Sequence, residues 1–453
     1  MRELQMKIYW NSPVFVQNIL TNLEGYRKNK VRFGPIYYRH LKALEQRDYM
    51  NKETTKSYQE EEMRKLLRHA VNHSPFYKKF YEGINIKTIQ SVSDLPKLPV
   101  LTKEILRNNA DEIYTVSEEN SVISMTSGTT GIPLKFLNTK ENFQQRMAHL
   151  DFFKKQHGVI GLEMKRASFS PQKFIPKGQK KTFWRDNATA KQRLYSTYYC
   201  NEQTAEKFAE NLNHYKPDFL DGLPSSIYEI ARWINKNNIQ LKFRPIAIFP
   251  TSETLYPHYR TEIERAFKCP VRDQYSSSEG SPFITECTQG NLHYHTDTGV
   301  IEVTEDGDML VTCFFTYGTP LIRYRIGDAV KLSDSQQTCA CGSAFPLVDW
   351  IQGRSNDFVQ SKSGRRFNFL HLSTTSPALV AAVDKMQFIQ HKPGRLIALM
   401  EAHENNRDAA TAVMREKLDY TFEGDMDIEI QFTDRIPVPE NSKFRLIINH
   451  SAS

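Results

Sequence analysis

Apolar side chains recur with helical spacing in the segment that follows Tyr58. The apolar positions lie three, four, seven and eight residues beyond the first of them: Met63, Leu66, Leu67, Ala70 and Val71. These intervals place the side chains on one face of an α-helix. Ser74 stands directly before Pro75, and a residue before proline disfavours the helical conformation, so we predict that the helix ends there.

Farther along, helical patterns alternate with short runs of buried-type residues. The predicted helices cover 140–155, 204–215, 225–237 and 256–267, and the predicted strands cover 122–125, 246–249 and 271–275. Such alternation is typical of a mostly parallel sheet covered by helices. Residues 160–200 show no clear period, and no element is predicted for them.

The two ends of the chain differ from this pattern. Residues 1–55 carry aromatic and basic side chains with few glycines, and we predict that they form a helical extension. Residues 283–333 are strand-like, with turns expected at Gly299, Gly307 and Gly318. A smaller α+β module follows, with a helix over 409–418 and a strand over 428–432. We therefore expect an α/β protein with a large N-terminal domain of several subdomains over 1–352 and a small C-terminal domain over 353–453.

The composition narrows the class of protein. The chain has 453 residues, 39% of them hydrophobic and 25% charged, which fits a globular protein of about two or three domains. Its 60 basic and 52 acidic residues are mixed along the chain, and the net charge of +8 suits anionic substrates better than nucleic acid. The chain has no run of about 18 uncharged apolar residues, and its first residues lack the apolar run of a signal peptide. We expect a cytoplasmic protein without a transmembrane segment or a nucleic-acid partner.

One loop has the composition of a phosphate-binding site. It follows the predicted strand at 122–125 and holds four hydroxyl side chains and two glycines: Thr126, Ser127, Gly128, Thr129, Thr130 and Gly131. Glycines let backbone amides approach an anion, and hydroxyls add further donors. Lys135 follows closely. The loop lacks the Gly-Lys-Ser/Thr ending of a Walker loop, so we expect a different kind of polyphosphate site.

Two carboxylates stand at predicted strand ends, where open α/β sheets bind ligands. Glu279 lies in Tyr-Ser-Ser-Ser-Glu-Gly, just after the strand at 271–275, and could hold Mg²⁺ against phosphates. Asp328 follows Gly327 at the end of a strand and could accept hydrogen bonds from a ribose. Arg354 lies near the expected domain boundary, and Lys443 lies in a turn near the C-terminus.

These motifs, in this order, resemble the adenylate-forming superfamily of acyl-CoA synthetases and aryl-CoA ligases. The nearest branch is that of the phenylacetate-CoA ligases and their capsule-biosynthesis, CapK-like relatives. The resemblance covers most of the chain and is strongest at 124–135, 250–280, 320–328, 353–359 and 439–445. It implies an adenylation domain followed by a mobile C-terminal lid.

The resemblance also implies roles for single residues. The hydroxyl-rich loop and Lys135 would bind phosphates, and Ser278 and Glu279 would lie near the α-phosphate and magnesium. The remaining nucleotide contacts would come from Ser252 and Glu253 along the adenine, Tyr275 beside the purine, Asp328 at the ribose and Arg354 near the hinge. Lys443 matches the lysine that stabilises the negative charges brought together during adenylation.

Two positions depart from the pattern of the superfamily. Ser442 replaces the usual glycine before the lysine, and Asn356 stands at the hinge carboxylate position with Asp357 beside it. Neither change removes a catalytic charge, but both bear on how the lid rotates.

Three cysteines and one histidine form a possible zinc set. Cys287, His293, Cys339 and Cys341 supply three thiolates and one imidazole, which is a complete tetrahedral set for structural zinc. Some members of the resembled branch carry a structural zinc at similar positions. Reduced free thiols and a redox pair remain alternatives, and His295 competes with His293 as the imidazole. Cys200, Cys269 and Cys313 are interpreted as buried structural thiols.

The implied enzyme is an acid–thiol ligase that uses ATP and Mg²⁺. A carboxylate and ATP would form an acyl-adenylate and pyrophosphate, and the acyl group would pass to coenzyme A. Alternatives are a ligase that joins the acyl group to an amine without coenzyme A, as in polysaccharide or capsule synthesis, and an adenylyltransferase in coenzyme biosynthesis that leaves AMP on its target. A catalytically inactive relative is the third class, and a homodimer is kept open as the oligomeric state.

Overall fold

The structure of the protein is a computed structural model. It describes residues 8–47, 51–125, 134–170, 172, 174–176, 179–200, 202–305, 307–334, 337–352, 358–363, 366–368, 382–422, 424–436 and 446–451. The chain divides into two compact units. The first comprises Met1–Ser252, Thr261–Ile326 and Val330–Trp350, and the second comprises Glu253–Arg260, Gly327–Ala329 and Ile351–Ser453. The division at 352/353 stays a prediction, and two short segments before it belong to the second unit.

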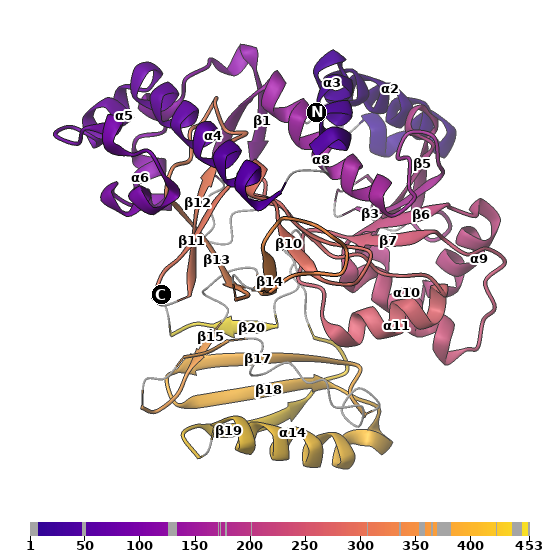
Figure 1. Cartoon of the computed structure of the whole chain (residues 1–453). Helices are drawn as coiled ribbons and strands as arrows, with labels where there is room; N and C mark the ends of the chain where they lie inside the picture. The colour runs from indigo at the N-terminus through magenta and orange to yellow at the C-terminus, as the bar shows by residue number, and fades with distance from the viewer. Residues whose placement is uncertain are drawn as a thin grey trace. The chain divides into compact units, whose positions relative to one another are not determined.

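The described part of residues 1–55 is helical, as predicted, and further helices follow it (Figure 1). In chain order they are α2 (Val14–Arg32), α3 (Pro35–Arg47), α4 (Lys52–His73), α5 (Pro75–Phe80), α6 (Lys103–Asn108) and α7 (Ala110–Ile113). The Asn51 side chain caps α4 by accepting a hydrogen bond from the amide of Thr54 at 2.9 Å. The helix ends before Pro75, which opens α5, so the predicted helix and its end are confirmed.

The first unit contains a five-stranded sheet, in the order β4-β5-β3-β6-β7. Its strands are β3 (Arg166–Ser170), β4 (Trp184–Asn187), β5 (Gln192–Ser196), β6 (Phe219–Gly222) and β7 (Ala247–Pro250). The β5-β3-β6-β7 part is parallel, and β4 pairs antiparallel at the edge. The expected parallel sheet is therefore confirmed.

Helices cover both faces of this sheet. They are α8 (Lys140–Gln156), α9 (Ala205–Tyr215), α10 (Pro224–Lys236) and α11 (Pro257–Phe267). Phe153 of α8 packs in one core with Phe219 and Phe249, whereas the ring of Phe208 in α9 lies 6.4 Å from that of Phe169. Phe169 of β3 pairs with Gly222 of β6, which lies three residues after Phe219. Because side chains along a strand alternate between the two faces of the sheet, Phe169 and Phe219 lie on opposite faces.

Residues 160–200, for which the sequence predicted nothing, supply three of these strands. The sequence of these strands does not show the apolar alternation of a strand, because several of their buried positions carry polar side chains that are paired with other polar side chains. Ser168 donates a hydrogen bond to Asp221 at 2.7 Å, Arg166 forms an ion pair with Asp221, and Arg185 Nε donates to Gln17 at 2.7 Å.

A second, seven-stranded sheet has the order β11-β12-β13-β14-β10-β9-β8. Its strands are β8 (Gln274–Tyr275), β9 (Ile284–Glu286), β10 (Leu292–Tyr294), β11 (Gly299–Val303), β12 (Asp308–Cys313), β13 (Tyr324–Leu332) and β14 (Leu347–Gln352). A separate hairpin joins β1 (Ser121–Met125) to β2 (Lys135–Thr139). The turn expected at Gly299 is found, because Gly299 ends the 3₁₀ turn at Thr296–Thr298 and opens β11, where a Cβ would meet Thr312 O at 2.4 Å. The strand expected over 271–275 shortens to β8, and Val271 makes only an isolated bridge to Ile248.

The second unit is a small α+β module built on a four-stranded sheet in the order β19-β18-β17-β20. Its elements are β15 (Phe358–Gln360), β16 (Arg366–Asn368), β17 (Lys385–Lys392), β18 (Arg395–Glu401), α14 (Arg407–Phe422), β19 (Asp427–Phe432) and β20 (Ile447–Asn449). Met414, Leu418 and Phe422 of α14 pack with Phe388 and Met400 in one core. The predicted helix and strand of this module are confirmed. No helix in the described part of the chain is long and apolar enough to cross a membrane.

Candidate active site and cysteine cluster

The ends of the hydroxyl-rich loop are held by the β1–β2 hairpin. Met125 is paired with Lys135 across the two strands, and Asn138 donates a hydrogen bond to Ser124 Oγ at 2.9 Å. Lys135 also forms an ion pair with Glu118. The hairpin therefore presents the two ends of the loop side by side. The loop residues lie outside the described residues: Thr126, Ser127, Gly128, Thr129, Thr130 and Gly131.

The carboxyl ends of β6 and β7 lie next to β8. Gly222 ends β6, where a Cβ would meet Phe169 O at 2.1 Å, so only glycine fits. The amide of Thr251 donates to Gly222 O at 2.9 Å, and Gln274 Nε2 donates to Pro250 O at 3.2 Å. These bonds bring the segment of Ser252 beside Tyr275. Ser252 is exposed and has a φ of 71°.

The turn that carries Glu279 is held by its own backbone and hydroxyls. The amide of Ser277 donates to Ser281 Oγ at 3.0 Å, and the amide of Ser281 donates back to Ser277 Oγ at 3.1 Å. Glu279 is buried and Ser278 is exposed. Gly280 has a φ of 98°, and a Cβ there would lie 2.8 Å from Thr316 Cγ2. The turn is thus fixed closely around a buried carboxylate, the ligand type that suits magnesium.

Arg146 of α8 is a residue of this site that the sequence analysis missed. Its Nη2 donates a hydrogen bond to Ser277 O at 2.5 Å, and its guanidinium carbon lies 6.0 Å from the centre of the Phe283 ring. Burial lowers the pKa of Arg146, and its Coulombic interactions with Cys313 and Glu279 oppose that effect. Arg146 falls on the buried stripe of α8 with Asn142 and His149, a position where a charge signals a specific partner.

Arg323 holds the proline-rich segment at 94–99 against the second sheet. Its Nε donates to both carboxylate oxygens of Glu302 at 3.0 Å, and its Nη1 donates to Leu98 O. Asp328 lies in the middle of β13, so the prediction that it follows the end of a strand is wrong. It belongs to the second unit together with Glu253. Arg354 and Lys443 lie outside the described residues.

The four proposed zinc ligands come together from three segments of the first unit. The ligand atoms of Cys287, His293, Cys339 and Cys341 all lie within 4.8 Å of one another. Cys287 Sγ lies 3.8 Å from Cys339 Sγ, and Cys341 Sγ lies 3.4 Å from His293 Nε2. Three thiols and an imidazole at these separations fit a tetrahedral zinc ion.

The surroundings of the cluster also suit a metal. His293 Nδ1 lies 2.9 Å from Phe345 O, so Nδ1 carries the proton and Nε2 is free to bind. Burial raises the pKa of Cys339, but hydrogen bonds from the Cys341 amide and the Asn291 side chain outweigh it and lower the pKa to about 6. His295, the competing imidazole, lies beyond the end of β10 and contacts Thr285 Oγ1 at 2.7 Å instead.

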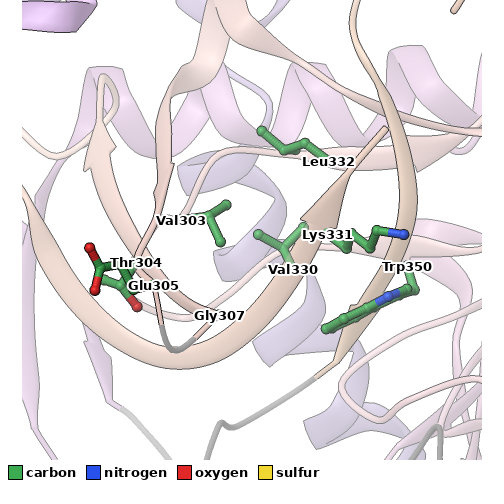
Figure 2. A pocket seen from close by; sticks show the side chains of 8 residues that line it. All are labelled: Val303, Thr304, Glu305, Gly307, Val330, Lys331, Leu332 and Trp350. Carbon is green, nitrogen blue, oxygen red and sulfur yellow. The ribbon is translucent and has the colours of Figure 1, made fainter. Parts of the chain in front are cut away.

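A separate hollow of about 520 Å³ lies on the second sheet (Figure 2). Val303 of β11, Val330 of β13 and Trp350 of β14 line it, together with Thr304, Glu305, Gly307, Lys331 and Leu332. None of the predicted site residues that the structure describes lines this hollow.

One known sequence resembles nearly the whole chain, and others resemble parts of it. The profile of the CapK C-terminal domain family matches residues 359–450. Protein CapK of Staphylococcus aureus is 34% identical over 451 residues, which cover 98% of this chain and 99% of that protein. Phenylacetate-coenzyme A ligase of Escherichia coli K12 is 25% identical over 331 residues, 66% of this chain and 71% of that enzyme. Indoleacetate–lysine synthetase of Pseudomonas savastanoi is 24% identical over 247 residues, 52% of this chain and 60% of that enzyme.

A solved structure shares the fold. The 2-hydroxyisobutyryl-CoA ligase in complex with R3-HIB-AMP superposes with a TM-score of 0.71 at 16% identity. The match covers 89% of this chain and 91% of that ligase. At this level of identity the likeness establishes the fold and leaves the substrate open.

Proposed function

The chain belongs to the CapK-like branch of the adenylate-forming ligase superfamily, and on this premise we propose that it activates a carboxylate with ATP and passes the acyl group to coenzyme A. A carboxylate oxygen attacks the α-phosphorus, the bond to pyrophosphate breaks, and an acyl-adenylate forms. The thiol then attacks the acyl carbon and AMP leaves with the bonding electron pair. The proton of the thiol is released to solvent.

The observation that best supports the first step is the buried carboxylate of Glu279 in a turn fixed by the Ser277–Ser281 pair and by Arg146. Glu279 would hold Mg²⁺, which neutralises phosphate charge when bound. The hydroxyl-rich loop at 126–131 would cradle the phosphates with Lys135, and Ser278 would contact the α-phosphate. The nucleoside would be held by Ser252, Glu253, Tyr275, Asp328 and Arg354.

Lys443 completes the proposed set. Its ammonium group would bridge the attacking carboxylate and the α-phosphate, where negative charges meet in the transition state. We propose that residues 353–453 act as a lid that carries this lysine to the site and rotates for the second step. The departures at Ser442 and Asn356 would then alter the rate of rotation rather than the adenylation chemistry.

Zinc has a structural role in this proposal. Cys287, His293, Cys339 and Cys341 would fill all four positions of a tetrahedral ion. A closed site of this kind stabilises the fold and leaves no position for a substrate. The ion would tie β10 to the segment that carries Cys339 and Cys341.

The acceptor is tested by product analysis. Similarity to phenylacetate-coenzyme A ligase supports coenzyme A. Similarity to indoleacetate–lysine synthetase favours an amine, such as an amino sugar or an amino acid, as the second candidate. Once the acid that the enzyme activates has been identified, we would incubate the enzyme with this acid, ATP and either coenzyme A or a panel of amines. The product would be identified by mass spectrometry. An acyl-CoA thioester is expected, whereas an amide formed equally well without coenzyme A would overturn this acceptor.

A further inference from the structure

Helix α2 is packed with its polar side inward. Asn22 Nδ2 donates to Asp186 O at 3.0 Å, and Asn22 Oδ1 accepts from the amide of Ala188 at 2.7 Å. Asn18 accepts from the amide of Asp186 at 3.1 Å, and Asn29 donates to Thr189 O at 3.1 Å. These bonds attach the helix along β4 and the turn that follows it, at the periphery of the first unit (Figure 1).

The apolar side of the same helix faces outward. The exposed fractions are 66% for Phe15, 55% for Ile19, 62% for Leu23 and 54% for Tyr26. At 3.6 residues per turn these four side chains fall within about 80° of one another around the helix axis. They form one continuous stripe, which we name the α2 stripe.

The α2 stripe cannot be hidden by turning the helix. Gly25 lies against Asn187, where a Cβ would come within 2.2 Å of Asn187 Oδ1. Rotation would break the hydrogen bonds of Asn18, Asn22 and Asn29 and would bury large side chains in this narrow contact. A contiguous exposed apolar surface of this kind marks an interaction site.

Charge around the stripe identifies the class of partner. Helix α2 itself holds four lysines and arginines but only one acidic residue, Glu24. Glu24 is paired with Arg27 and Lys28. Lys30 lies 4.6 Å above the ring of Tyr26, next to the stripe. The surface therefore combines large apolar side chains with excess positive charge.

We propose that α2 docks the chain on the surface of an anionic lipid bilayer. The α2 stripe enters the boundary between headgroups and acyl chains, and Lys30 meets the anionic headgroups. Pairing with a second copy would instead bring the same basic residues of two chains together, which costs electrostatic energy. The helix lies on the membrane in this proposal and does not span it.

The test is flotation of the full-length protein with vesicles of phosphatidylcholine, with and without phosphatidylglycerol. Wild type is expected to float with the anionic vesicles and to detach as salt rises, because basic side chains supply part of the affinity. The double variant Phe15→Ser/Leu23→Ser should bind at least about tenfold more weakly, since it loses half of the stripe. Exposed positions tolerate such changes without unfolding.

The matched control is Ile239→Ser, which removes an apolar side chain with an exposed fraction of 37% far along the chain. It should float like wild type. Charge is tested separately by Lys30→Gln, which should weaken binding to anionic vesicles and flatten its salt dependence.

Two results would overturn the proposal. One is wild type that fails to float with anionic vesicles at low salt. The other is a dimer, measured by light scattering, that the stripe variant converts to monomer while vesicle binding is unchanged, because the stripe would then be a contact between copies.

Discussion

Arg146 offers the sharpest test of how the Glu279 turn is held in place. Its Nη2 donates to Ser277 O at 2.5 Å, and its positive charge lies near the buried carboxylate. Arg146→Met keeps the length of the side chain and removes the donor and the charge. We expect the turn to loosen and adenylation to slow.

The size of the effect follows from the hydrogen bond that the methionine variant cannot make. A hydrogen bond to a charged group contributes about 1.5–3 kcal/mol. The methionine side chain would still pack against Phe283, and this contact offsets part of the free energy lost with the hydrogen bond. A net loss of about 2 kcal/mol, if expressed in the transition state, lowers kcat/KM about thirtyfold.

The assay is ATP–pyrophosphate exchange with the cognate acid, with kcat and KM measured separately and rates normalised to folded protein. Arg146→Lys, which keeps the charge, should recover part of the rate. Lys154→Met is the matched control on the same helix, because it removes a buried cation that pairs with Asp151 at 3.3 Å. It should leave exchange near wild type. Unchanged kcat/KM in Arg146→Met would refute the role given to this arginine.

Three further predictions follow from single positions. Gly280→Ala should lower the rate of exchange about tenfold, because the added Cβ would crowd Thr316. The control is Gly307→Ala, because Gly307 has a similar φ but open space around it, and this variant should exchange normally. Equal losses in the two variants would contradict the prediction. Lys443→Ala should abolish adenylate formation and leave ATP binding by calorimetry nearly intact, and wild-type exchange would remove its assigned role. Metal analysis should find about one zinc per chain, lost in Cys341→Ser and on acidification as the ligands bind protons, and a stable wild-type protein without zinc would exclude the site.

Much of the fold could be predicted because its elements have clear periods. The α4 pattern of Met63, Leu66, Leu67 and Ala70 became a buried helical face, and the alternation over 204–267 became part of the parallel sheet. The cysteine and histidine candidates came together as a group because each stands in or beside a strand or turn of the same sheet region. Their zinc ion remains a prediction.

Other features depend on partners that are distant in the sequence. The strands at 160–200 bury polar residues such as Ser168 and Arg185, whose partners Asp221 and Gln17 lie far along the chain. Arg146 resembles an ordinary helical arginine until Ser277 is placed beside it. The spacing on α2 shows an apolar side and a polar side, but only the hydrogen bonds to Asp186 and its neighbours show which side is buried.

The most direct test of the central claim is ATP–pyrophosphate exchange across a panel of aromatic, aliphatic and amino acids, using wild type and Glu279→Gln. Glu305→Gln, a change at an exposed glutamate in the hollow on the second sheet, is the control. We predict exchange with one class of acid in wild type and Glu305→Gln, and its loss in Glu279→Gln. No exchange with any acid, or equal exchange in all three proteins, would contradict the account.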